Sequence, residues 1–369
     1  MAISHEWLTV PGGSEKVVAS LLDLFPESEI FTSVYDPEPW PAAITSRPVH
    51  VSFLDRIPGA RDNYPKLLPL MNAAFESFDL SRFDLVISSN HSCAKNVLTR
   101  PDTLHVCYCH TPMRYAWEPG FLKDEPMGGP ARLMAPMLIG GIRRRDLAAS
   151  SRPDRYVANS RHVAARIEKY YRREAEVIHP PVDVQRFLDV PRTEGDYYLC
   201  LGRVVPYKRA DHAVAACARL HRPLKVVGGG RGLEGLRPLA GPDTELLGSV
   251  ADHELPGLIA GARALLFPGE EDFGIVPVEV QAAGVPVIAY GVGGARDSVV
   301  DGETGVLYDE QSVDGLTRAI LDFEQSSLAE EAIRDNARRF SPERFADEFS
   351  ALLEATEAPQ PPRRTTQPA

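Results

Sequence analysis

The chain has 369 residues, which is too many for one compact core and suits two domains of ordinary size. Hydrophobic residues make up 44% and charged residues 25%, as in folded globular proteins, so the composition excludes wholesale disorder. The net charge of −11 argues against a nucleic-acid binder, because such proteins carry an excess of basic residues. No apolar run reaches the length of about 18 residues that spans a bilayer. The N-terminal stretch MAISHEWLTVPGG lacks the basic and apolar regions of a signal peptide, so we expect a cytoplasmic protein.

The cysteines indicate neither a disulfide framework nor a zinc knuckle. Their number is odd and they contain no C-x-x-C pair, which is typical of reduced, mostly buried thiols. They are Cys93, Cys107, Cys109, Cys200 and Cys217.

Short runs rich in Val, Ile and Leu alternate with longer helical periods along nearly the whole chain. This alternation predicts βαβ units and parallel sheets covered by helices on both faces. We expect strands at residues 29–35, 83–89, 104–110, 154–160, 175–179, 197–202, 224–229, 244–248, 262–268, 285–290 and 304–308. Helical periods lie at residues 13–25, 161–173 and 312–325.

The segment 179–196 divides this alternation into two series. It contains three prolines and no clear period, so we interpret it as an interdomain linker. The predicted fold is therefore α/β, with Rossmann-like domains at 1–178 and 197–340 that face each other across a cleft. A final amphipathic helix is expected at 341–357 and a disordered tail at 358–369. Ligands of such sheets bind at the carboxyl ends of the strands, so functional residues are sought in the loops that follow strands.

The first chemically distinctive loop is GRVVPYKR (202–209), which directly follows a predicted strand. It places Arg203, Lys208 and Arg209 at the expected start of a helix. A guanidinium, an ammonium and a helix N-terminus together suit a diphosphate. The alternative interpretation is a solvated basic turn.

The second distinctive loop lies within GEEDFGIVPVEVQAAGVPVIAYGVGGARD (269–297), after the strand at 262–268. Glu271 precedes the loop, and Glu279 is expected in the first turn of a helix that begins near Pro277. A carboxylate there could accept both hydroxyls of a ribose. The alternative is that both glutamates only stabilise the helix N-terminus.

Taken in order, these motifs resemble the retaining family 4 glycosyltransferases of GT-B fold. The resemblance rests on G-R-x₄-K, E-D-F-G-I-x₃-E, A-x-G-x-P-V-I-A and G-G-x-x-D-x-V-x-D-G-x-T-G-x-L in the second half. The first half adds PGGSEKV (11–17), HTPMRYAWE (110–118) and ANSRHVAARI (158–167). The segment HTPMRYAW in particular is similar to bacterial mannosyltransferases. In this family the last helix crosses back onto the N-terminal domain.

The resemblance implies roles for individual residues. Arg203 and Lys208 would neutralise the nucleotide diphosphate, and Glu279 would bind the ribose. Other positions implied to surround the donor are Glu271, Phe273, Gly274, Ile275 and Gly229. In the first half, His110 would lie by the donor sugar, and Gly12 and Gly13 would approach its phosphate. The implied catalytic residues are His110, Arg203, Lys208 and Glu271.

Several residues of the first half keep two interpretations. His110 ends an apolar strand, where a lone histidine is either structural or functional. Tyr115 and Trp117 could stack on an acceptor sugar or pack the wall of the cleft. The stretch 131–146 is apolar with a basic end, so it could form a packed helix pair or rest on a membrane as a peripheral contact.

The expected reaction is transfer of a hexosyl group from a nucleotide-sugar to a hydroxyl of a glycan, a lipid-linked acceptor or a natural product. No carboxylate pair for double displacement is evident. The resemblance implies a front-face retaining route. No D-x-D motif occurs, and we expect neither a metal ion nor another cofactor. GDP-mannose is the favoured donor, with UDP- and TDP-sugars as rivals. Alternative functions are a nucleotide-sugar epimerase and a two-lobed sugar-binding protein. The acceptor, the linkage and the oligomeric state cannot be read from the sequence.

Overall fold

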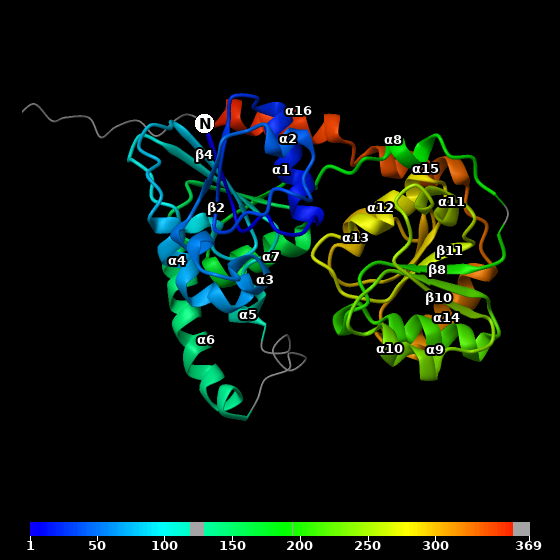
Figure 1. Cartoon of the computed structure of the whole chain (residues 1–369). Coiled ribbons are helices and arrows are strands. Elements are labelled where there is room, and N and C mark those ends of the chain that lie inside the picture. Colours follow the sequence, from blue (N-terminus) through cyan, green and yellow to red (C-terminus); the bar gives the residue numbers. More distant parts are fainter. Residues whose placement is uncertain (119–128, 194, 357–369) are drawn as a thin grey trace, which may run out of the picture. The chain divides into compact units, whose positions relative to one another are not determined.

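The computed structural model describes residues 1–118, 129–193 and 195–356 (Figure 1). The predicted tail at 358–369 lies outside the described residues. The chain forms two compact units: residues 1–179 together with 345–356 form unit 1, and Pro180–Arg344 form unit 2.

Unit 1 is built on a seven-stranded parallel sheet. Its strand order is β3 (Val49–Val51), β2 (Glu29–Thr32), β1 (Ala2–His5), β4 (Leu85–Asn90), β5 (Leu104–Cys109), β6 (Arg155–Ala158) and β7 (Glu176–Val177). Its helices are α1 (Gly13–Leu24), α2 (Ala42–Thr45), α3 (Ala60–Asn63), α4 (Leu68–Glu76), α5 (Arg114–Trp117), α6 (Gly129–Ala149), α7 (Arg161–Tyr171) and most of α16 (Pro342–Ala355). Short 3₁₀ turns are η1 (Phe53–Arg56), η2 (Tyr64–Leu67) and η3 (Ala94–Asn96).

Unit 2 contains a six-stranded parallel sheet. Its strand order is β10 (Thr244–Gly248), β9 (Leu224–Val227), β8 (Tyr198–Leu201), β11 (Ala264–Phe267), β12 (Val287–Tyr290) and β13 (Gly305–Tyr308). Its helices are α8 (Gln185–Leu188), α9 (Ala210–Leu220), α10 (Leu233–Leu236), α11 (Leu255–Ala260), α12 (Ile275–Ala282), α13 (Ala295–Ser298), α14 (Val313–Glu324) and α15 (Glu330–Arg338). Two 3₁₀ turns are η4 (Pro206–Lys208) and η5 (Arg237–Leu239).

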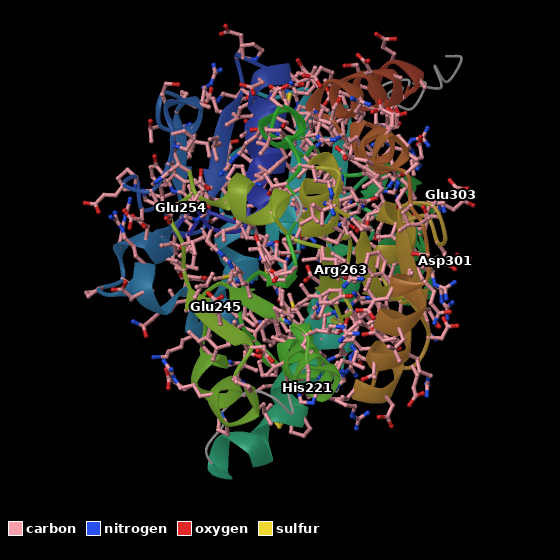
Figure 2. The ribbon with its side chains drawn as sticks, turned by 90° about the vertical axis from the view of Figure 1, so that its right-hand side faces the viewer. His221, Glu245, Glu254, Arg263, Asp301 and Glu303 are labelled. Atoms are coloured by element: carbon pink, nitrogen blue, oxygen red, sulfur yellow. The ribbon has the colours of Figure 1, made fainter. Side chains whose placement is uncertain are left out.

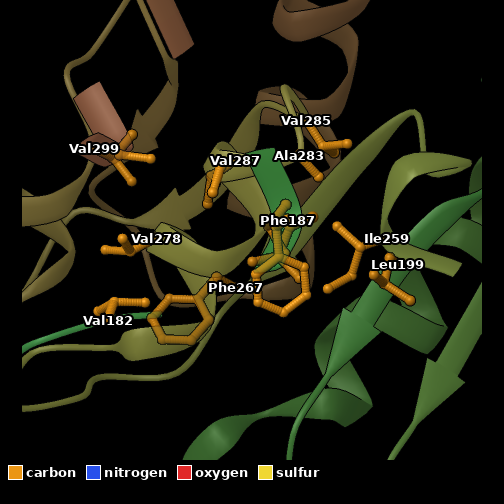
Figure 3. Packing of buried hydrophobic residues seen from close by; sticks show 14 of the residues in the cluster. Val182, Phe187, Leu199, Ile259, Phe267, Val278, Ala283, Val285, Val287 and Val299 are labelled. Carbon is orange, nitrogen blue, oxygen red and sulfur yellow. The ribbon is translucent and has the colours of Figure 1, made fainter. Parts of the chain in front are cut away.

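Alternating side chains of the inner strands of unit 2 enter two different cores, as a pleated strand requires. Leu199 and Val287 pack with α8 and α12 on one face of the sheet (Figure 3). The neighbouring residues Tyr198 and Ile288 pack with α9 and α14 on the other face. Burial on both faces explains why these strands are continuous apolar runs, the pattern from which a helix-covered parallel sheet was predicted.

Helix α9 ends where the backbone turns into the left-handed region. His221, labelled in Figure 2, lies at this end of the helix. It has φ 53° and donates its backbone N–H to carbonyls of the last helical turn. A residue in this conformation commonly closes a helix, although glycine is the usual choice. The chain then enters β9 directly.

The last helix, α16, packs on unit 1, as the resemblance implied. Phe345, Phe349 and Leu352 of this helix, which Figure 1 draws in red, share a core with Ile3 of β1 and Tyr108 of β5. The Phe345 and Tyr108 rings meet edge to face at 5.8 Å. The predicted return of the chain to its first unit is thus confirmed.

The segment 179–196 is more ordered than a free linker. It contains α8, and Val182, Val184 and Phe187 are buried in the core of unit 2. Its prolines hid this packing because they interrupt any periodic pattern. Strand β3 was also missed, because three residues are too few to show alternation.

Candidate functional site

In the parallel sheet of unit 2, the order in which successive strands are added reverses between the neighbouring strands β8 and β11. From β8 the chain continues to β9 and β10 on one side, whereas β12 and β13 follow β11 on the other side. The loops after two such strands diverge and leave a crevice, which is where open α/β sheets bind their ligands. A pocket lies here, and its lining includes Gly202, Arg203, Lys208 and Glu271. The fold therefore brings together three of the four residues predicted to be catalytic.

The basic residues lie in the loop before α9. Arg203 is exposed, and 18% of the Lys208 side chain is exposed. Helix α9 begins at Ala210 with Arg209 as its N-cap, so Arg203 and Lys208 lie in the loop that leads into the helix. Arg209 forms an ion pair with Asp211, with 2.7 Å between its Nη2 and the carboxylate Oδ2, so its charge is compensated within the loop.

Glycines hold the loop after β8 in place. Gly228 and Gly230 have φ +130° and +145°, and a Cβ atom on them would lie 2.0 Å and 2.4 Å from the carbonyl oxygens of Gly202 and Val204. Between them, the Gly229 carbonyl accepts a hydrogen bond from the Val204 backbone N–H at 2.8 Å. Gly229, predicted as a donor-binding residue, thus supports the loop that carries Arg203.

Glu271 follows β11 and reaches the same pocket. Its Oε1 atom lies 2.6 Å from Nζ of Lys208. Behind this ion pair, Gly269 lets the two loops touch, since a Cβ there would lie 2.7 Å from Cα of Lys208. Both side chains of the pair are mostly buried, with 18% of Lys208 and 19% of Glu271 exposed.

The loop after Glu271 leads into α12 through Gly274, the N-cap with φ +86°. The Gly294 backbone N–H donates to the Glu271 carbonyl at 2.8 Å. A Cβ on Gly294 would lie 2.2 Å from Cα of Phe273, so the two loops are packed backbone against backbone. This packing fixes Phe273, Gly274 and Ile275 at the helix N-terminus, where backbone N–H groups attract anions.

Glu279 lies farther along α12 than expected. The helix begins at Ile275 and not near Pro277, which places Glu279 in the second turn. Its side chain is half-buried. The early start follows from Gly274, whose left-handed conformation lets the chain turn directly into the helix.

The corresponding switch point in the sheet of unit 1 lies between β1 and β4, and a buried carboxylate stands there instead of cationic side chains. The buried Glu6 carboxylate accepts backbone N–H groups of His91, Ser92 and Ala94 through Oε1, at 3.0, 2.6 and 3.1 Å. Its Oε2 accepts the Cys93 N–H at 2.8 Å. Such a nest of N–H groups usually binds an external anion. Here the protein's own carboxylate fills it.

His110 directly follows β5 and is partly exposed. Its Nε2 lies 2.8 Å from Oγ of Ser89, which in turn lies 3.1 Å from Nδ1 of His5. The other nitrogen of His5 lies 3.1 Å from Oε1 of Glu15, at the start of α1. His5, Ser89 and Glu15 were not predicted as site residues from the sequence, although Glu15 lies inside the motif PGGSEKV.

Gly12 and Gly13 are exposed at the start of α1, where Gly12 is the N-cap. A Cβ on Gly12 would lie 2.9 Å from Oε2 of Glu15. The first glycine therefore makes room for the Glu15 carboxylate in the first turn of the helix.

The two aromatic residues predicted near the acceptor differ in environment. Trp117 stacks on Tyr170 with ring centroids 4.8 Å apart, and its indole N–H donates to Asp146 Oδ2 at 2.6 Å. Its ring is thus engaged in packing α5 against α6 and α7. Tyr115 has 37% of its surface exposed.

The stretch 131–146 lies within one helix, α6, and does not form the predicted helix pair. Pro136, Gly140 and Gly141 are all accommodated inside it. Its second half is anchored by Asp146, whose Oδ1 lies 2.5 Å from Nζ of the buried Lys95. The three residues have low helix propensity and each costs about 1–3 kcal/mol in a free helix, so tertiary packing has to stabilise α6.

Among the described residues, no helix combines the length and apolar character needed to cross a membrane. Within the same residues, no group of three or more His, Cys, Asp and Glu side chains is arranged to hold a metal ion.

Two family models match the chain in consecutive segments. Residues 11–186 match the model "Glycosyltransferase Family 4", and residues 184–340 match "Glycosyl transferases group 1". Together they span both units described above.

Among curated relatives, a GDP-mannose-dependent alpha-(1-6)-phosphatidylinositol monomannoside mannosyltransferase of Mycobacterium tuberculosis is 35% identical over 176 residues, 40% of this chain and 46% of that protein. A D-inositol 3-phosphate glycosyltransferase of Streptomyces avermitilis is 33% identical over 205 residues, 46% of this chain and 44% of that protein. The chain thus spans about half the length of these relatives.

Solved structures match over nearly the whole chain. The Anabaena HepE protein in complex with UDP superimposes with a TM-score of 0.69 at 16% identity, covering 96% of this chain and 100% of that one. A sucrose-phosphate synthase of Thermosynechococcus elongatus gives 0.72 at 19% identity, covering 96% and 98%. These likenesses show the GT-B fold, as predicted. With both family models matched in order, the chain belongs to the family 4 glycosyltransferases.

Proposed function

We propose that the protein transfers a glycosyl group from a nucleotide-sugar to an acceptor hydroxyl, and that unit 2 binds the donor. The observation that carries this proposal is the pocket between the loops after β8 and β11, which Arg203 and Lys208 line. In an acidic chain, two cationic side chains at the switch point of the sheet favour an anionic ligand.

The charges of the two units support binding of the diphosphate by unit 2. In unit 1 the equivalent N–H groups are already satisfied by Glu6. In unit 2 the diphosphate would take Lys208 from Glu271, freeing that carboxylate to accept hydroxyls of the donor sugar. Arg203 would bind two phosphate oxygens and the backbone at Gly274 a third, while Glu279 would accept the ribose hydroxyls.

Catalysis would then consist of stabilising the departing diphosphate. Negative charge grows on the leaving oxygen, and fixed cations and helix N–H groups stabilise that charge without reorganising. We propose a front-face retaining route in which this oxygen receives the acceptor proton. Because Arg203 and Lys208 supply the compensating charge, we propose that no metal ion takes part.

GDP-mannose is the donor we propose, supported by the GDP-mannose-dependent relative. UDP-sugars are the second candidate, since HepE was solved with UDP-glucose. The names of the curated relatives favour an inositol-containing or lipid-linked acceptor.

The test is nucleotide release from GDP-mannose, UDP-glucose and a TDP-sugar, measured with and without inositol phosphate or a phosphatidylinositol acceptor. Lys208→Met keeps the aliphatic stem and removes the charge, and we expect kcat/KM to fall about 10²-fold. The matched control is Lys225→Met. Lys225 is on β9 and its ammonium lies over the ring of Tyr197, so the same substitution removes a charge that the proposed site does not use. Equal turnover of the two variants would refute the assignment of Lys208.

Further readouts separate the alternative functions. Free nucleotide together with an altered sugar and no acceptor product would indicate an epimerase, and binding without any release would indicate a sugar-binding protein. Retention is tested by anomer-resolved NMR of the product, where an inverted anomer refutes the front-face route. Loss of turnover in EDTA that returns with Mg²⁺ or Mn²⁺ would refute metal independence.

A further inference from the structure

Four polar side chains of unit 1 form a continuous row that the donor pocket does not use. Glu15 Oε1 lies 3.1 Å from His5 Nε2, and His5 Nδ1 lies 3.1 Å from Ser89 Oγ. Ser89 Oγ lies 2.8 Å from His110 Nε2. These residues come from α1, β1, β4 and the loop after β5, so the tertiary fold alone brings them together.

The row leads from the protein interior to its surface. Glu15, His5 and Ser89 are buried, whereas His110 is partly exposed at the carboxyl end of β5. Burying a carboxylate, an imidazole and a hydroxyl is costly unless each finds a partner. Here every inner group is paired with its neighbours in the row.

Hydrogen-bond chemistry gives the row a direction. An ionised carboxylate only accepts, so Glu15 fixes the proton of neutral His5 on Nε2 and leaves Nδ1 as an acceptor. Ser89 then donates its hydroxyl to Nδ1, and its oxygen accepts the Nε2–H of His110. The remaining nitrogen of His110, Nδ1, carries a lone pair.

The charge states agree with this direction. Burial raises the pKa of Glu15, but the hydrogen bond from His5 and the residue's own backbone N–H act against burial, and the pKa is about 2, so the carboxylate is ionised. Burial lowers the pKa of His110 to about 3, although the charge of Glu15 acts in the opposite direction. The His91 ring lies 6.5 Å from both other rings, and Tyr108 packs against His110 at 5.2 Å.

We propose that Glu15, His5 and Ser89 are positioning residues that hold His110 in its Nε2–H tautomer, with an unprotonated Nδ1. This nitrogen accepts a hydrogen bond from a substrate hydroxyl, and no proton is transferred along the row. The proposal rests on the proposed function only for the identity of that hydroxyl.

The decisive test is long-range ¹H–¹⁵N NMR of the full-length protein labelled in its ten histidines, with His110 assigned through a His110→Asn variant. We expect the Nε2–H tautomer of His110 in the natural protein. Glu15→Gln and Ser89→Ala should each shift His110 toward Nδ1–H or a mixture. An Nδ1–H tautomer in the natural protein, or no change in either variant, overturns the proposal.

Two matched controls lie in the same unit. Ser88→Ala removes the neighbouring hydroxyl, which is 3.0 Å from His105 Nε2. Glu29→Gln removes a separate glutamate–histidine pair, 2.6 Å from His50 Nε2. Both control variants should leave the His110 tautomer unchanged. If they shift the tautomer as much as Ser89→Ala and Glu15→Gln do, the effect comes from a general loss of packing in unit 1, and the proposal is refuted.

Kinetics provide the second readout. Ser89→Ala and Glu15→Gln should each lower kcat/KM about 10-fold, because a His110 that carries its proton on Nδ1 loses the hydrogen bond from the substrate hydroxyl. Unchanged kcat/KM in both variants overturns the role of the row. Because the NMR readout needs no substrate, failure of donor binding would refute the proposed function and leave this test intact. Ser89→Ala, which removes a single atom, serves if Glu15→Gln does not fold.

Discussion

Gly294 offers a test of how far the donor site depends on backbone packing. Its φ is −70°, which any residue adopts, so Gly294→Ala introduces no backbone strain. The new Cβ would, however, lie 2.2 Å from Cα and 2.5 Å from the carbonyl oxygen of Phe273. The substitution therefore acts only by displacing the loop that leads into α12.

The size of the effect follows from these distances. An ordinary Cβ contact begins at 3.4 Å. The Phe273 backbone must therefore retreat by roughly 1 Å, and a misplacement of that size costs about 10²-fold in rate. Overpacking of this kind destabilises a protein by about 1–3 kcal/mol. We expect weaker donor binding, a kcat/KM lowered about 10²-fold and a moderately lower Tm.

The assay combines calorimetric titration with GDP and UDP, steady-state kinetics and thermal melting. The control is Gly257→Ala in α11, where a Cβ would meet nothing within 4 Å. That variant should keep its donor affinity, and its free energy of unfolding should rise by about 0.5–1 kcal/mol, since alanine suits a helix better than glycine. If Gly294→Ala binds and turns over donor like the natural protein, the loop at Phe273 plays no part in the site.

Three other substitutions test the structure. The folded-state pKa of Glu15, about 2, lies below the ordinary 4.5, so its stabilisation is full above pH 4.5 and disappears as the pH falls toward 2. In urea titrations, the free energies of unfolding of the natural protein and of Glu15→Gln should differ by roughly 3 kcal/mol at pH 7 and by little near pH 2. A difference that stays constant with pH would contradict the lowered pKa. Phe349→Ala should cost unit 1 about 3–5 kcal/mol, and calorimetry should show its transition lowered while that of unit 2 stays. Asp146→Asn leaves the buried Lys95 charge uncompensated, so urea unfolding should reveal a loss of about 3–5 kcal/mol; an unchanged midpoint would contradict the pair.

The fold was largely readable from the sequence because its strands are buried on both faces. Apolar runs such as FDLVISS and LHVCYCH mark β4 and β5 without help from tertiary context. Strand β1 did not appear as a run, because Ser4, His5 and Glu6 are buried polar residues. Their partners come from β4 and α1, far away in the chain, and no local pattern reports them.

The candidate site was partly readable. The loops that carry Arg203, Lys208 and Glu271 follow strands, so their meeting at one edge of the sheet could be expected. The ion pair between Lys208 and Glu271 could not, because it depends on Gly269 bringing two loops into contact. The row ending at His110 was hidden for the same reason, since each hydrogen bond joins separate elements.

The placement of α16 has a consequence for biosynthesis. Phe345 and Phe349 complete the core of the unit that the ribosome makes first, yet they emerge after all of unit 2. Domains usually fold in order as they leave the ribosome, but here the first must wait with part of its apolar surface uncovered. Nascent chains that stop before residue 345 should therefore bind chaperones and resist proteases only over residues 180–344.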